Sequence, residues 1–82
     1  MESNPLVARR QKMFKVNFYD KQQCEVASHE INCITKEAAA DIARIETYDN
    51  NYSNGYETFV VRDSSTNYIV ATGSWDSKPK IY

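Results

Sequence analysis

One well-capped helical segment lies between two strand-like halves of this chain, and it limits the possible folds more than any other pattern. Thr35 has a side chain suited to a helix N-cap, and helix-forming alanines follow shortly after it. Ala38, Ile42 and Ile45 recur at spacings of four and three residues, which places them on one helical face. The pattern predicts a helix over residues 36–47 with these three side chains facing the core.

Strand patterns precede and follow this helix. Residues 13–19 alternate, with Phe14, Val16 and Phe18 on one face and mainly polar side chains on the other, as in a half-buried strand. Bounding turn residues and β-branched or aromatic side chains mark further strands. Three of them are expected, at residues 24–31, 57–62 and 68–75.

The order strand, strand, helix, strand, strand predicts an α+β fold: a four-stranded antiparallel sheet with one helix packed on one face (β-β-α-β-β). The 82 residues suffice for one small domain, expected over residues 12–82. Residues 1–11 are expected to form an N-terminal arm or a short helix. Residues 49–55 are rich in Asn, Ser and Gly and are expected to form a loop. In the tail, Pro79 excludes a central strand.

Charge is unevenly distributed along the chain, although the net charge is only −1. Residues 1–21 carry five basic and two acidic side chains, whereas residues 22–63 carry eight acidic and three basic ones. Such asymmetry indicates a charged partner surface. The chain shows neither a secretory signal nor an apolar run of membrane-spanning length, which predicts a cytoplasmic protein with two free thiols.

The residue types used in catalysis and zinc binding are scarce. His29 is the only histidine, and a strand offset of five residues from Cys24 places the two side chains on opposite faces. With Cys33 these residues supply at most three zinc ligands, without the paired spacing of a tetrahedral site. No nucleophile with a base, no phosphate-binding loop and no nucleophile elbow is found. We therefore expect neither an enzyme nor a cofactor.

A calcium loop is suggested by three oxygen-bearing side chains at alternate positions, Asp49, Asn51 and Ser53. In an EF-hand loop the glycine is the sixth residue and a bidentate glutamate is the twelfth. Here Gly55 comes one residue late and Val60 occupies the twelfth position. Because the strongest ligand is missing, we expect no metal at this segment.

Tyrosines at every fourth position, in a segment otherwise rich in Asn, Asp, Ser and Gly, favour contact with another macromolecule. Tyrosine supplies a rigid, amphipathic contact surface, and Asn and Ser add adaptable hydrogen bonds. Acidic residues of the neighbouring helix would add a negative field suited to a basic partner. The expected partner-binding residues are Tyr48, Asp49, Asn51, Tyr52, Asn54 and Tyr56, with Glu37, Asp41 and Glu46 on the helix. Tyr48 and Tyr56 are also expected to cover the edge of the core.

The layout of the second part of the chain begins at the helix start Thr35-Lys36-Glu37-Ala38-Ala39-Ala40, continues through Ala43-Arg44-Ile45-Glu46-Thr47, and ends with the hairpin at Trp75. In this layout the chain resembles small bacteriophage inhibitors of host defence, the anti-CRISPR proteins in particular. The resemblance is one of size, charge and element order, and it covers about two-thirds of the chain. It implies a non-enzymatic protein that occludes a basic nucleic-acid-binding or subunit-binding surface of a larger protein or nucleoprotein complex, in the host cytoplasm. It assigns no role to any individual residue.

Two other functions fit parts of the sequence. A small nucleic-acid-binding protein could use the basic segment Arg9-Arg10-Gln11-Lys12 on phosphates, with Tyr19, Tyr68 or Trp75 stacking on bases. A sequence pI near 5.7 opposes this reading. A homodimer could form by pairing exposed sheet edges.

Overall fold

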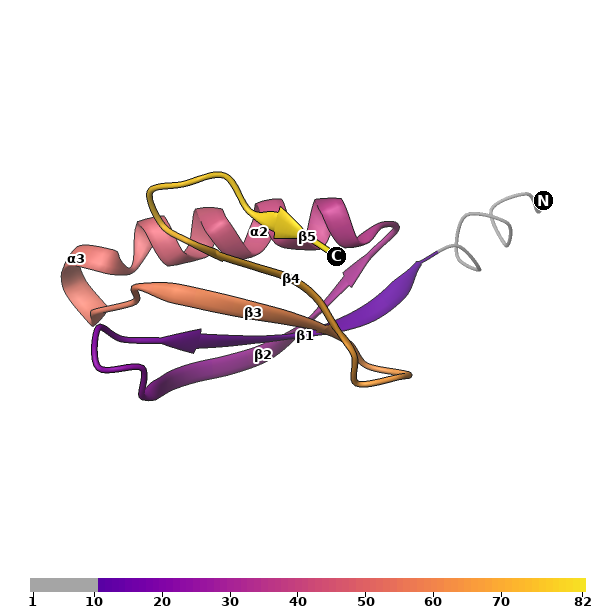
Figure 1. Cartoon of the computed structure of the whole chain (residues 1–82), viewed down its shortest axis with the longest axis horizontal. Coiled ribbons are helices and arrows are strands. Elements are labelled where there is room, and N and C mark those ends of the chain that lie inside the picture. Colours follow the sequence, from indigo (N-terminus) through magenta and orange to yellow (C-terminus); the bar gives the residue numbers. More distant parts are fainter. Residues whose placement is uncertain (1–10) are drawn as a thin grey trace.

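The computed structural model describes residues 11–82, in which a helix crosses one face of an antiparallel sheet (Figure 1). The elements in chain order are β1 (Lys12–Tyr19), β2 (Glu25–Cys33), α2 (Lys36–Asp49), α3 (Asn51–Asn54), β3 (Thr58–Asp63), β4 (Ile69–Ser74) and β5 (Lys80–Ile81). The sheet order is β2-β1-β3-β4-β5. The predicted α+β class and antiparallel sheet are confirmed, but the sheet has five strands rather than four. The predicted N-terminal arm lies, apart from residue 11, outside the described residues.

Strand β1 is central to the packing, as its alternation predicts. Phe14, Val16 and Phe18 are buried on the face that α2 covers. In the register of β1 with β3, Val16 lies opposite Val61 and Phe18 lies opposite Phe59, so the core is continuous across both strands. Burial of one face explains why the period-two pattern was strong enough to identify this strand.

The turn between β1 and β2 forms without glycine. Gln23 adopts a left-handed backbone with φ of 65°, and its N–H donates to the Asp20 carbonyl at 2.9 Å. The Asp20 carboxylate accepts hydrogen bonds from the N–H groups of Gln22 and Cys24, each at 2.9 Å. These bonds offset the conformational cost of a non-glycine residue at positive φ.

Helix α2 begins where the sequence predicts but is rotated relative to the expected apolar face. The Thr35 hydroxyl accepts from the Ala38 N–H at 3.1 Å, which confirms the N-cap. The residues buried against the sheet are Ala39, Ala40, Ala43 and Thr47. Ile42 and Ile45 are instead 41% and 52% exposed, so the prediction that they pack on the sheet is wrong. Small side chains let the helix lie close to a sheet face already filled by phenylalanines.

The segment predicted as a loop after α2 contains a second, short helix. Asn50, at φ −110° and ψ 8°, interrupts the helical backbone after Asp49, two residues beyond the predicted end. One further turn, α3, then forms and ends at Gly55, whose φ of 74° is left-handed. The Asn54 N–H donates to the Asn50 carbonyl at 3.0 Å. Asn50 thus ends α2 and Gly55 ends α3, and the residues between them form one helical turn.

The chain ends at the sheet edge opposite β2. Strand β5 pairs with β4 through Ala71 and Ile81, and Ile81 packs against the core. This short edge strand follows Pro79, in agreement with the expectation that proline excludes a central strand here. None of the helices in residues 11–82 is long and apolar enough to cross a membrane.

Asp63 holds the turn between β3 and β4, and we expect its stabilising effect to depend on pH. Its Oδ1 accepts from the Ser65 hydroxyl at 2.6 Å and from the Ser65 N–H at 2.8 Å, and Lys12 Nζ lies 3.9 Å from Oδ2. The hydrogen bonds from Ser65, aided by Lys12, lower the pKa of Asp63 below its usual range. The stability that this carboxylate contributes is therefore complete above the pKa of the unfolded chain, about 3.9. It is lost as the pH falls through the lower folded pKa.

Denaturant unfolding of the chain and of Asp63→Asn, measured at several pH values, tests this expectation. The difference in unfolding free energy should be largest at neutral pH and should disappear in acid. Asp41→Asn removes one negative charge from the exposed surface of α2 and is the control for net charge. A difference for Asp63→Asn that stays constant from neutral pH into acid would contradict the prediction.

Candidate functional site

The three regularly spaced tyrosines have different environments. Tyr56 is half-buried, with its ring 4.9 Å from the ring of Phe18, so it covers the core edge as predicted. Tyr48, on the last turn of α2, is 61% exposed. Tyr52, on α3, is 99% exposed and is the most exposed large hydrophobic side chain in the described part of the protein. A residue of this size with so little packing is available for contact with a partner.

The asparagines around Tyr52 mainly hold the local backbone. Asn51 Nδ2 donates to the Tyr56 carbonyl at 2.6 Å, and Asn54 Nδ2 donates to Asn50 Oδ1 at 2.7 Å. Asn50 Nδ2 in turn donates to the Glu46 carbonyl at 2.8 Å. Of the residues expected to bind a partner, Asn51 and Asn54 are thus engaged within the chain, and their first effect is to hold α3 in place.

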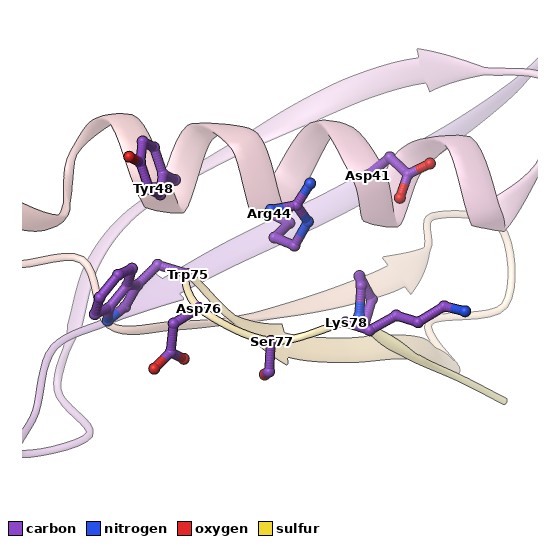
Figure 2. A pocket seen from close by; sticks show the side chains of 8 residues that line it. Asp41, Arg44, Tyr48, Trp75, Asp76, Ser77 and Lys78 are labelled. Carbon is purple, nitrogen blue, oxygen red and sulfur yellow. The ribbon is translucent and has the colours of Figure 1, made fainter.

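A groove runs between α2 and the segment joining β4 to β5 (Figure 2). Its volume is about 440 Å³. Tyr48 and Trp75 form one end, with ring centroids 6.2 Å apart, and Arg44 and Lys78 approach it from opposite walls. Asp41, one of the predicted residues, lies farther along the same helix wall.

Trp75 was not among the partner-binding residues predicted from the sequence. Its Nε1 donates to a Glu57 carboxylate oxygen at 3.1 Å, and this bond orients the indole beside Tyr48. The sequence signal was present, since this is the only tryptophan and it ends a predicted strand. Its position beside Tyr48 depends on the tertiary fold, because β4 and α2 are distant in sequence.

Acidic side chains gather at the end of the molecule that carries α3. We call this the α3 end: residues 20–24, 49–57 and 75–76, which lie together at one end of the sheet (Figure 1). It contains four acidic residues and one basic residue, a net charge of −3. The acidic residues are Asp20, Asp49, Glu57 and Asp76, and the basic residue is Lys21. None of these carboxylates forms an ion pair with another residue in the range 11–82.

The predicted acidic face of the helix is divided by the fold. Glu46 points toward β2, where both its carboxylate oxygens lie 2.8 Å from His29 Nε2. Glu37 and Asp41 face the opposite side and share a shallow hollow with Lys78. The three carboxylates therefore form no single negative surface.

The described residues show no grouping of side chains suited to a metal ion: no group of three or more His, Cys, Asp or Glu side chains within residues 11–82 is arranged to hold one. Both cysteines are free: Cys24 is exposed, and Cys33 is buried, which raises the pKa of its thiol. In the calcium-like segment Asn51 and Ser53 lie on a helix, where alternate residues point in different directions.

Comparisons of the chain with protein-family models, with curated proteins and with solved structures find no match. An assignment of function must therefore come from the geometry of the chain. The α3 end combines the exposed side chain of Tyr52, an adjoining groove and carboxylates that form no ion pair with another described residue, and it is the strongest candidate site within the described residues.

Proposed function

We propose that this chain is a non-enzymatic protein-binding module whose α3 end attaches to a basic surface of a larger protein or nucleoprotein complex. The observation that carries the proposal is the nearly complete exposure of Tyr52 in a region with a net charge of −3. Exposed aromatic side chains serve as anchors in protein interfaces, and surrounding charges select a partner of opposite sign.

The α3 end also has the rigidity that an interface requires. Tyr48 is on a regular helix, Trp75 is held by its bond to Glu57, and α3 is fixed at both ends by asparagine hydrogen bonds. A backbone that is already ordered loses little conformational entropy on binding, which leaves more of the contact energy as affinity.

A negative, aromatic-bearing end suits a protein that covers a surface otherwise used by nucleic acid. Such a surface is basic because it must attract phosphates. This agrees with the resemblance in size and element order to the phage-encoded inhibitors of host defence. We therefore propose inhibition by occlusion, in the host cytoplasm, as the biological role.

Paired substitutions test the proposal. The chain is immobilised, the proteins retained from a host lysate are identified, and the partner is then titrated by calorimetry. Tyr52→Ala combined with Asp49→Ala should raise the dissociation constant at least about tenfold. Tyr68→Ala is the matched control, because Tyr68 is 74% exposed but lies in the turn between β3 and β4, away from α3. Excess duplex DNA or RNA should release the partner.

Two outcomes would count against this function. One is an unchanged dissociation constant for the Tyr52 and Asp49 double variant. The other is direct binding of nucleic acid by the isolated chain in a mobility-shift titration, weakening steeply as salt is raised. That second result would support the small nucleic-acid-binding protein instead, with contacts from Arg9, Arg10 and Lys12.

A further inference from the structure

Strand β2 forms an edge of the sheet that no other strand within residues 11–82 covers. It is nine residues long, and its only strand partner in the described part of the chain is β1. The opposite edge strand, β5, has only two residues. In a paired strand, alternate backbone N–H and C=O groups of the outer side remain available for another strand. The β2 edge is therefore the larger site for strand addition.

A register irregularity, one of the features that disrupt pairing at such an edge, occurs only at one end of β2. The register with β1 shifts between Phe18 and Tyr19, which leaves an irregularity beside Val26. From Ala27 to Cys33 the pairing is regular, and no proline interrupts it. A regular run of this length is sufficient for an added strand of ordinary size.

Negative charge surrounds the edge on both faces. Glu25 and Glu30 belong to β2 itself, and Glu46 and Asp49 lie on the flank of α2 that faces β2. The nearest basic side chain in the pairing register is Lys15, opposite Glu30 on β1. With four carboxylates against two lysines of β1, Lys15 and Lys12 (opposite Cys33), the edge favours a basic segment and disfavours a second copy of itself.

The two faces beside the edge differ in character. On the helix side, half-buried Ala27 and Ile31 adjoin the core, and Ile42 and Ile45 line a shallow hollow of about 370 Å³ on α2. Glu46 connects the two, since it lines the hollow and pairs with His29 of β2. On the open side, Ser28, Glu30 and Asn32 are exposed. An added strand would find apolar neighbours together with Glu46 on the helix side, and Glu30 on the open side.

We propose that the β2 edge accepts an extended segment of a partner protein as a sixth strand, with apolar side chains toward α2 and lysine or arginine side chains toward Glu30. Backbone hydrogen bonds would supply the general affinity, and the alternation of the two faces would supply selectivity. This surface shares only Asp49 with the α3 end and does not include Tyr52, so the inference does not depend on the function proposed above.

A synthetic peptide of about eight residues, alternating valine and lysine, is the probe. Binding to the full chain is followed by calorimetry and by amide hydrogen exchange. The peptide should slow exchange at alternate N–H groups of β2. A peptide with glutamate in place of lysine should bind at least about threefold more weakly, because its charges repel those of the edge. A peptide N-methylated at those alternate residues whose N–H groups would face β2 loses these hydrogen-bond donors and should not bind.

Two charge-reversed variants locate the site. Glu30→Lys should weaken the valine–lysine peptide about threefold to tenfold, whereas Asp41→Lys, on the opposite flank of α2, should leave it unchanged. Tyr52→Ala should also leave it unchanged, which separates this result from a failure at the α3 end. Thermal unfolding of each variant verifies that the fold is retained.

Other occupants of the edge would give distinct results, and each would overturn the proposal. Sedimentation of a dimer with protected β2 amides would show that a second copy occupies the edge. Slow exchange of the outward β2 amides in the free monomer would show that the chain itself covers them. Equal binding of the N-methylated peptide would show that no strand is added.

Discussion

Replacing Ala43 with leucine is expected to lower the free energy of unfolding by about 1–3 kcal/mol. Ala43 is fully buried between α2 and the sheet, beside other alanines that are equally buried. The added carbon atoms could fit only if the helix moved away from Phe14, Phe18 and Phe59, which form the sheet side of the same core. Loss of those close contacts is the physical cause of the expected cost.

Ile42→Ala is the matched substitution at the neighbouring position, and it should change stability by less than about 0.5 kcal/mol. Its side chain is largely outside the core, and alanine is the better helix former. The free energies of unfolding of both variants are measured by urea unfolding, and they can be compared directly if the two m-values are equal. A larger loss for Ile42→Ala than for Ala43→Leu would mean that the isoleucine face is buried, and it would contradict the helix rotation described above.

Gly73→Ala is expected to destabilise the protein by about 1–3 kcal/mol, although glycine-to-alanine changes in ordinary backbone often stabilise by about 0.4–1 kcal/mol. A Cβ at this position would lie 2.7 Å from Cζ of Phe59 and 3.3 Å from Cα of Pro79. Phe59 is buried, so its ring cannot move out into solvent. The clash therefore outweighs the gain in chain entropy.

A double-mutant cycle with Phe59→Leu tests whether the ring causes this cost. Leucine lacks the atoms that a Cβ at position 73 would meet. Phe59→Leu alone should destabilise by leaving a cavity, but the double variant should be more stable than the sum of the single effects predicts, by about 1 kcal/mol. Additive effects within about 0.3 kcal/mol would show that another contact, such as Pro79, limits the site.

The local sequence was sufficient to predict those helices and strands whose residue pattern allows only one interpretation. The alternation of Phe14, Val16 and Phe18 can bury only one face, and Thr35 can cap only the helix that follows it. Both predictions are confirmed by the structure. The class and the antiparallel sheet follow from the order of these elements, which needs no knowledge of their detailed packing.

The rotation of α2 could not be predicted, because two periodic faces compete on the same helix. The set containing Ile42 and Ile45 is the more hydrophobic, but the set containing Ala39 and Ala43 is the one that is buried. The choice depends on how much space three phenylalanines of the sheet leave beneath the helix, which is a non-local quantity. Strand β5 was missed for a similar reason, since two residues pair only because β4 presents an edge to them.

Part of the candidate site, the exposure of Tyr52, could be predicted from the sequence. The exposure of Tyr52 follows from its polar surroundings, whatever the local backbone, and the structure agrees. The separation of Glu46 from Asp41 depends on the orientation of the helix and on His29, a residue of another strand. The pairing of Tyr48 with Trp75 likewise depends on strand order, so it required the fold.

The position of Trp75 has a practical consequence for work on this protein. It is the only tryptophan of the chain, and its indole lies between Tyr48 and Glu57 at the α3 end. Fluorescence excited at the long-wavelength edge of protein absorption, where tryptophan absorbs and tyrosine does not, therefore reports from one location, the wall of the groove in Figure 2. The unmodified protein thus carries an intrinsic fluorophore at the surface where a partner would be sought, and no label has to be attached there.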